Sequence, residues 1–359
     1  MMINDSYGFF DVRKMGAAGD GVSDDTAAFQ AAVDAAAAQE GIVFVPPGKY
    51  LIRTIHAAPR IRICGSANFS FRAVGGSVLI QHPGTENGKA LIDITGAFGV
   101  QLEGLCLRGR AGSGDEIVHG IGLFKEDYGK EEDTPAIINC RIERFSGDAI
   151  HLERVWCFSV RHCHCLGNLG SGLAMRGWDA FVMDNWFSGN YGAGFTSMEE
   201  NASVTMTGNR IEWNRKGGIV IRRGVKYNIT GNYIDRSGCF GIELEHAGDI
   251  AVSGNVIYRS GKPEWTDPEK SAHCSIRDCR GVAFTGNSLA CGRDDGGQGE
   301  FSPVCGLKLH QLENCVIANN TLHECALDEM ICSSGDMENC VIENNPGSLR
   351  PAANKRQRS

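Results

Sequence analysis

Two glutamates in the segment 241–245 have the residue type and spacing that glycoside cleavage requires. Glu243 and Glu245 stand two positions apart, so on a β-strand both carboxyls would point to the same face, about 6.6 Å apart. Hydrolysis of a glycosidic bond uses one protonated carboxyl and one ionised carboxylate, and this separation falls at the lower edge of the inverting range. Asp235, in the turn before Glu243, offers a third carboxyl. The sequence therefore predicts a glycoside hydrolase with Glu243, Glu245 and Asp235 as catalytic residues.

Similar short segments, each alternating apolar and polar residues, occur before and after these glutamates. They cover residues 149–153, 173–176, 195–198, 219–222, 242–245, 274–277 and 307–310. The positions expected to face a core are Ile150, Leu152, Leu173, Met175, Ile219, Ile221, Ile242, Leu244, Ile276, Leu307 and Leu309. If the strands stack in order, the outer face carries a first column of His151, Ala174, Thr196, Val220, Glu243, Ser275 and Lys308. The second column is Glu153, Arg176, Met198, Arg222, Glu245, Arg277 and His310. We expect this face to be the substrate-binding groove.

The environments of the two glutamates should differ. Arg222 and Arg277 would flank Glu245 and hold it ionised, whereas Glu243 would have no cation beside it. Unequal environments would give the two carboxyls different pKa values, as a general acid and a general base require. The alternative is that these residues form ordinary ion pairs on the surface, each of which would stabilise the fold by only tenths of a kcal/mol.

A lyase or epimerase would use the same groove differently. Such an enzyme removes the proton beside a uronate carboxylate and stabilises the resulting negative charge with cations. The cations of the two columns that would bind this carboxylate are Arg176, Arg222, Arg277 and Lys308. His151 or His310 would then be the base.

A repeat of about 23 residues places these strands. Asn209, Asn232 and Asn255 each follow a Gly and are spaced by 23, and the series continues through Asn287, Asn320 and Asn345. Going backward, it meets Asn185, Cys163 and Cys140. Units this short must stack on their neighbours to bury their apolar faces. A leucine-rich repeat would show leucines at fixed offsets, which are missing. We therefore predict an all-β parallel β-helix with regular rungs over residues 90–345 and a ladder of asparagines at one corner.

Three steps of the repeat are longer than 23 residues, namely 104–140, 255–287 and 287–320. We expect the extra residues to fall just before the groove strands and to wall the same face. Their functional side chains are Glu116, His119, Trp265, Asp267, His273, Arg293, Asp294, Asp295 and Glu300. Long polar insertions on a rigid scaffold commonly bind ligands. Trp265 would stack on a sugar ring, and Asp294 and Asp295 would contact substrate.

The first 55 residues differ from the repeat and predict an N-terminal cap. An alanine-rich helix over 27–38, with Asp or Thr at its start, would cover the open end of the stack. Asp20, Asp24 and Asp25 do not have the spacing of a calcium loop. We expect one domain over residues 1–345 and a disordered tail over 346–359, which is polar and basic.

Residues 9–53 resemble the opening signature of the pectate-lyase-like superfamily. The segments that carry the resemblance are Phe10-Asp11-Val12, Gly19–Ala32 and Val45–Tyr50. This resemblance implies a right-handed parallel β-helix acting on saccharides, shared by hydrolases, lyases, epimerases and phage tailspikes. Gly231–Gly254 is also faintly similar to β-helical inulin fructotransferases. Since tailspikes and several enzymes of the group are trimers, the resemblance further implies a homotrimer. A noncatalytic saccharide-binding or tailspike-like protein is the alternative from another class.

The composition indicates which classes of partner and which cellular location are expected. With 35 Lys and Arg against 43 Asp and Glu, the net charge is −8, which disfavours nucleic-acid binding. No apolar run reaches the roughly 18 residues of a membrane helix. Residues 1–10 show no leader, so the sequence as written suggests the cytoplasm, while an extracellular or virion-associated place remains open.

The 15 cysteines are expected to be reduced and mostly buried. Alternation along a strand argues against metal binding by residues 162–165, and no cofactor or metal is expected.

Overall fold

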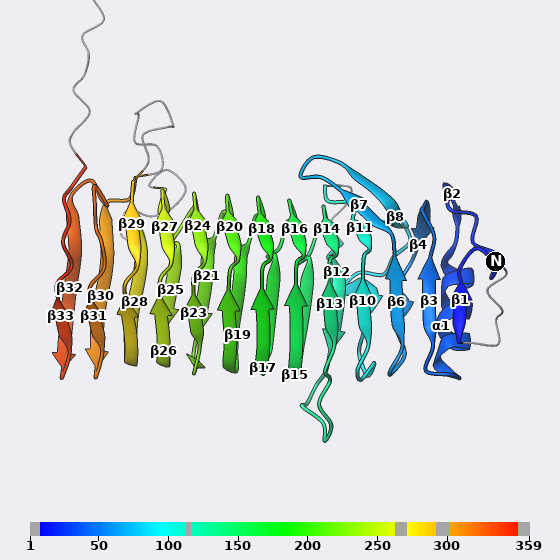
Figure 1. The fold of residues 1–359 in the computed structure, drawn as a ribbon, viewed down its shortest axis with the longest axis horizontal. Helices are drawn as coiled ribbons and strands as arrows, with labels where there is room; N and C mark the ends of the chain where they lie inside the picture. The colour runs from blue at the N-terminus through cyan, green and yellow to red at the C-terminus, as the bar shows by residue number, and fades with distance from the viewer. Residues whose placement is uncertain (1–7, 113–115, 263–270, 292–301, 351–359) are drawn as a thin grey trace, which may run out of the picture. The chain divides into compact units, whose positions relative to one another are not determined.

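The computed structural model describes residues 8–112, 116–262, 271–291 and 302–350. The chain divides into two compact units, residues 1–191 and 192–359, and each is a stack of short parallel strands (Figure 1). Among the described residues, the only antiparallel strand pairing joins β7 (Ala67–Phe69) to β8 (Val74–Gln81). No helix among the described residues has the length and apolarity needed to cross a bilayer.

The first unit has three sheets, one on each side of the coil. The groove sheet contains β5 (Ile55–His56), β9 (Lys89–Asp93), β12 (Val118–Phe124), the first half of β15 (Ile150–Arg161) and of β17 (Leu173–Met183). The second sheet contains β1 (Phe9–Asp11), β3 (Ile42–Val45), β6 (Arg62–Gly65), β10 (Gln101–Glu103), β13 (Ala136–Ile138) and the later halves of β15 and β17. The third contains β2 (Asp20–Asp24), β4 (Gly48–Ile52), β8 (Val74–Gln81), β11 (Cys106–Arg108), β14 (Arg141–Glu143), β16 (His164–Leu166) and β18 (Trp186–Ser188), with β7 (Ala67–Phe69) at its side.

The second unit repeats this plan. Its groove sheet contains the start of β19 (Ala193–Thr207), β21 (Gly217–Arg222), β25 (Ile242–Glu245) and the first parts of β28 (Ala272–Thr285), β30 (Cys305–Glu313) and β32 (Glu329–Glu338). The second sheet contains β22 (Gly224–Val225), β23 (Asn228–Thr230), β26 (Gly248–Ser253), β31 (Val316–Ala318) and β33 (Val341–Glu343), with the later parts of β19 and β28. The third contains β20 (Arg210–Glu212), β24 (Tyr233–Asp235), β27 (Val256–Tyr258) and β29 (Ser288–Ala290).

The apolar positions predicted to face the core are all buried. None of the eleven residues from Ile150 to Leu309 exposes more than 4% of its surface. Alternation along a strand sends these side chains inward, and burial of each contributes about 1.5–3 kcal/mol. The all-β parallel β-helix predicted from the sequence is therefore confirmed.

The asparagine ladder is also confirmed in the second unit. The side-chain amide of Asn209 donates to Oδ1 of Asn232, that of Asn232 to Asn255, and that of Asn255 to Asn287, at 2.8, 3.0 and 2.9 Å. The ladder continues to Asn320 and Asn345. Within the first unit, Asn168 donates to Asn190 at 2.9 Å in a second ladder that the spacing did not predict. Buried amides of this kind satisfy one another and fix the corner.

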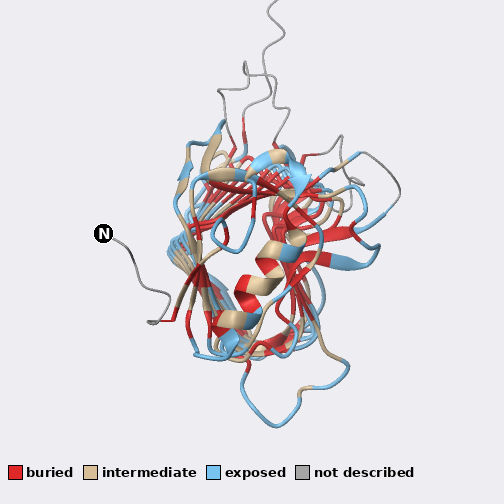
Figure 2. Cartoon of the chain, turned by 90° about the vertical axis from the view of Figure 1, so that its right-hand side faces the viewer, coloured by how far each residue is buried: buried red, intermediate tan, exposed pale blue. Residues whose placement is uncertain are grey.

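Helix α1 (Thr26–Ala37) lies across the interior of the first coil, as Figure 2 shows. Its buried residues are Phe29, Ala32, Val33 and Ala36, the positions that the helical spacing selected. Of the acidic residues at the helix start, Asp24 accepts the backbone N–H of Thr26 at 3.1 Å, whereas the side chain of Asp25 makes no hydrogen bond to the helix. The Asp25 carboxylate instead accepts the backbone N–H groups of Ala18 and Gly19 at 2.6 and 3.1 Å, and so fixes the preceding loop.

Two further expectations need correction. The first long step places residues 125–135 after the groove strand β12, not before it, because marker spacing gives the length of a rung but not which turn is longer. The expected tail begins too early, since Leu322 N–H donates to Pro346 O at 2.8 Å and Ser348 N–H donates to Leu322 O at 3.1 Å. Residues 351–359 lie outside the described residues, and a single domain over 1–345 stays a prediction.

Candidate active site

The register of the second unit places the two predicted columns as expected. Glu243 pairs with Val220 on one side and Ser275 on the other, and Ser275 pairs with Lys308. The second column runs from Arg222 through Glu245 and Arg277 to His310. In-register stacking makes each column continuous because inward apolar residues fix which side chains face outward.

The two glutamates share a cation, which the sequence did not predict. Arg222 Nη2 lies 3.4 Å from Oε1 of Glu243, and its Nε lies 3.1 Å from Oε2 of Glu245. Arg277 also forms an ion pair with Glu245. The expectation that Glu243 has no cation beside it is therefore wrong, because the long arginine side chain reaches both carboxylates on the next rung.

Asp235 lies on β24 of the third sheet, so the structure does not bring it together with the glutamates of the groove sheet. It is almost fully buried, and its carboxylate lies 2.8 Å from Arg259 Nη2 and 2.5 Å from Arg236 Nη1. Burial raises the pKa of Asp235, while these two guanidinium groups oppose the rise.

The remaining predicted groove residues are divided between the described and undescribed parts of the chain. His310 Nδ1 lies 3.0 Å from Ser334 Oγ on the next strand, and Lys308 pairs in register with Cys332. In the first unit, Arg176 pairs in register with Glu153. Trp265, Asp294 and Asp295 lie outside the described residues.

A compact cluster of titratable groups occupies the groove sheet of the first unit. Asp148 precedes β15, and its Oδ2 lies 2.8 Å from Nδ1 of His151. The other imidazole nitrogen, Nε2, lies 3.4 Å from Oε1 of Glu153. Asp148 is held by the backbone N–H of Ser171, which donates to its Oδ1 at 2.6 Å. The carboxylate is thus fixed by the next rung and in turn orients the imidazole.

His119 on β12 completes this cluster. Its ring centroid lies 4.3 Å from that of His151, and its Nδ1 accepts the backbone N–H of Asp148 at 2.9 Å. Phe124 contacts both rings, with its centroid 5.7 Å from that of His151 and 6.0 Å from that of His119. Sequence analysis selected His151, Glu153 and His119 but missed Asp148, whose only signal was a Gly-Asp pair directly before a groove strand.

The surroundings give the two histidines different protonation states near neutral pH. Burial alone would lower the pKa of His151, but its hydrogen bonds with Asp148 and Glu153 raise this pKa to about 9. Burial and the charge of His151 lower the pKa of His119 to about 4. The hydrogen bond with His151 also lowers the pKa of Glu153. An imidazolium between two carboxylates therefore faces the groove, next to a neutral histidine.

The same residues have the types that bind transition metals. Ligand atoms of His119, Asp148 and His151 all lie within 4.8 Å of one another. However, Nδ1 of His119 already accepts a backbone N–H, and Nδ1 of His151 already bonds to Asp148. These hydrogen bonds occupy the Nδ1 atoms of both histidines and fix the orientation of their rings.

The chain belongs to the family described as "Rhamnogalacturonase A/epimerase, pectate lyase-like", whose model matches residues 9–243. A second model, "Right handed beta helix region", matches residues 197–350. Among curated proteins, mannuronan C5-epimerase AlgE5 of Azotobacter vinelandii is 59% identical over 44 residues, which are 12% of this chain and 4% of that protein. The chain thus matches only a small part of the length of such relatives.

Solved structures with the same fold belong to several saccharide-related proteins. The A-module of mannuronan C-5 epimerase AlgE4 from A. vinelandii has a TM-score of 0.73 at 18% identity, covering 95% of this chain and 99% of that one. The enzymatically active domain of tailspike protein 2 from bacteriophage CBA120 has a TM-score of 0.70 at 16% identity, covering 87% and 47%. DFA-IIIase from Arthrobacter chlorophenolicus has a TM-score of 0.65 at 14% identity, covering 92% and 88%. The pectate-lyase-like resemblance is thereby confirmed, and the family is one of carbohydrate-active β-helix enzymes.

Proposed function

We propose that this protein acts on an acidic polysaccharide by moving the proton on the carbon that bears the carboxylate, as an epimerase or a lyase does. The observation that carries the proposal is the Asp148–His151–Glu153 cluster on the outer face of the groove sheet. It joins an oriented proton donor to a second carboxylate, which is what general acid–base chemistry requires.

Each residue of the cluster has a separate role. Asp148 holds the imidazole through Nδ1, so that Nε2–H is the proton that His151 can donate. The positive charge of the His151 imidazolium also neutralises the substrate carboxylate, which makes the proton on the neighbouring carbon more acidic. Glu153, ionised and the most exposed of the three at 36% of its side chain, is positioned to accept the proton. Arg176, beside it in register, adds positive charge to the groove.

The curated relatives support this reaction. The curated relatives with 59% identity over a short stretch are mannuronan C5-epimerases, and an epimerase module covers 95% of the chain in structure. Mannuronan is a polymer of uronate residues, the substrate class that a cationic imidazole would suit.

Exchange with deuterated solvent tests the proposal. The protein is incubated in D2O with polymannuronate and with polygalacturonate, and deuterium at the carbon beside the carboxylate is measured by NMR. Exchange without chain cleavage indicates an epimerase, and an unsaturated product seen by ultraviolet absorbance indicates a lyase. Binding with neither product would refute the reaction and favour the noncatalytic saccharide-binding alternative.

Glycoside hydrolysis at Glu243 and Glu245 is the second candidate function. It is favoured by the finding that both carboxylates face outward on one strand, as the predicted inverting pair would. A reducing-end assay on neutral and acidic polysaccharides tests it. Hydrolysis requires that Glu243→Gln and Glu245→Gln each lower the release of reducing ends by about two to four orders of magnitude.

A further inference from the structure

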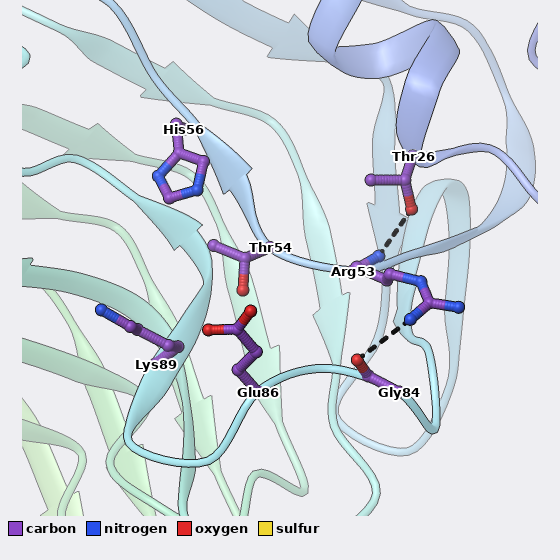
Figure 3. A pocket seen from close by; sticks show the side chains of 7 residues that line it. All are labelled: Thr26, Arg53, Thr54, His56, Gly84, Glu86 and Lys89. Carbon is purple, nitrogen blue, oxygen red and sulfur yellow. Dashed lines mark hydrogen bonds between the residues drawn. The ribbon is translucent and has the colours of Figure 1, made fainter.

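A pocket opens on the first unit, away from the His151 cluster. It is a pocket of about 230 Å³ between the start of α1, the segment leading into β5 and the segment leading into β9. Figure 3 shows the side chains that line it, which are Thr26, Arg53, Thr54, His56, Gly84, Glu86 and Lys89. None of these seven residues belongs to the His151 cluster of the proposed reaction.

Three polar groups of this pocket lack a partner among the residues that the structure describes. The exposed side chains of Lys89 and Glu86 form no hydrogen bond or ion pair there, and the buried Oγ1 of Thr54 has no hydrogen-bond partner. In Figure 3 the Glu86 carboxylate points toward the Thr54 hydroxyl. The buried Thr54 hydroxyl without a partner costs about 1–3 kcal/mol, which a ligand hydroxyl in the pocket would offset.

Arg53 provides a held cation at the same pocket. Its Nε lies 3.1 Å from Asp24 Oδ2, and its Nη1 donates to the Gly84 carbonyl at 3.3 Å. Thr26 is the first residue of α1, and its backbone N–H already donates to Asp24 Oδ1 at 3.1 Å. Lys89, whose ammonium group has no partner among the described residues, is therefore the cation that remains for an anionic ligand. Glu86 and Thr54 are suited to sugar hydroxyls, which a carboxylate and a threonine can both bind.

The pocket is continuous with the face that carries the His151 cluster. In register, His56 pairs with Asp93, Asp93 with Gly122, and Gly122 with His151. Three rungs separate His56 from His151, a distance of about 14 Å. Both sites therefore lie on the outer face of one sheet, so one extended saccharide can reach both.

We propose that this pocket is a distal binding site for a uronate residue of the polysaccharide that reacts at His151. Lys89 and Arg53 bind the sugar carboxylate, and Thr54 and Glu86 bind its hydroxyls. This inference rests on the proposed function for its substrate class. It adds that the enzyme recognises the charge of a residue several sugars away from the reacting one.

Calorimetric titration tests the pocket without any need for turnover. The probes are hexamers of mannuronate and of galacturonate, and the same hexamers with their carboxyls reduced to alcohols. We expect Lys89→Gln to weaken binding of an acidic hexamer about tenfold, the change for one lost charge-assisted hydrogen bond. Lys49→Gln is the matched control, because Lys49 is also exposed in the first unit but lies on β4 of the third sheet. It should bind as tightly as the unaltered protein.

The outcomes separate this inference from the proposed function. The binding site is refuted if Lys89→Gln and Lys49→Gln have equal affinity for both acidic hexamers. It is also refuted if the reduced hexamers bind as tightly as the acidic ones. Absence of any binding to the unaltered protein would overturn it as well. If acidic hexamers bind through Lys89 but exchange no proton with solvent, the pocket stands and the proposed reaction fails.

Discussion

His151 and Asp148 form a hydrogen-bonded pair, with Nδ1 of the imidazole 2.8 Å from Oδ2 of the carboxylate. The chain turns between them, so that Asp148 lies before β15 and His151 is its second residue. Because the pair fixes one nitrogen of the ring, the other must face Glu153, 3.4 Å away. This geometry specifies a proton donor and the direction in which it points.

Replacement of His151 should abolish most of the activity. His151→Gln keeps a polar side chain but removes the titrating group, so turnover of the acidic polysaccharide should fall by about two to four orders of magnitude. His162→Gln is the control, since His162 is an exposed histidine of the same unit that lies 3.6 Å from Asp184. Steady-state kinetics of both variants, with circular dichroism to verify folding, provide the measurement. Equal rates would refute a catalytic role for His151.

Activity should fall in alkaline solution. The pKa of His151 is raised to about 9, so the donor is protonated at neutral pH and loses its proton as the pH passes about 9. A profile of kcat/KM against pH should therefore show a descending limb near this value. Activity that instead increases through pH 9 would show that neutral His151 acts as the base.

Acid should destabilise the fold through two buried histidines. Burial lowers the pKa of His119 to about 4 and that of His273 to about 3. Unfolded histidine has a pKa of about 6.5, so each contributes stability that is present above this value and is lost as the pH falls through the folded pKa. Thermal unfolding midpoints measured from pH 7 down to pH 4 should decrease, and His273→Leu should reduce the slope. An unchanged slope in this variant would contradict the assignment.

The asparagine ladder should contribute strongly to stability. Asn232 Oδ1 accepts the backbone N–H and the side-chain amide of Asn209, so Asn232→Ala leaves two buried donors without a partner. Urea unfolding should show a loss of roughly 2 to 4 kcal/mol. Asn228→Ala, at an exposed position that only accepts the Thr230 hydroxyl, should cost far less. Similar losses in both variants would mean that the ladder adds nothing specific.

Assembly into a homotrimer stays a prediction based on the family resemblance. Light scattering should give a mass near three times the 38.7 kDa of one chain, independent of concentration in the micromolar range. A mass equal to one chain at high concentration would reject the trimer.

Local sequence was enough to predict the stack and much of its outer face. In a parallel β-helix every strand alternates, and each apolar position that must be buried also determines its neighbours that face outward. The columns through Glu243 and Glu245 and the amide ladder at Asn232 follow from this rule, because both depend only on position within a 23-residue repeat.

Tertiary structure alone decided how the outward side chains meet. Arg222 reaches two carboxylates rather than one, since a flexible side chain is not restricted to its own column. His119 approaches His151 from a strand whose rung contains an insertion, so repeat spacing could not align the two residues. Asp148 occupies a turn, where alternation gives no direction, and only the N–H of Ser171 on the next rung turns its carboxylate toward the imidazole. The sequence by itself determined which residues face the groove, whereas contacts between rungs decided which of them carry a proton.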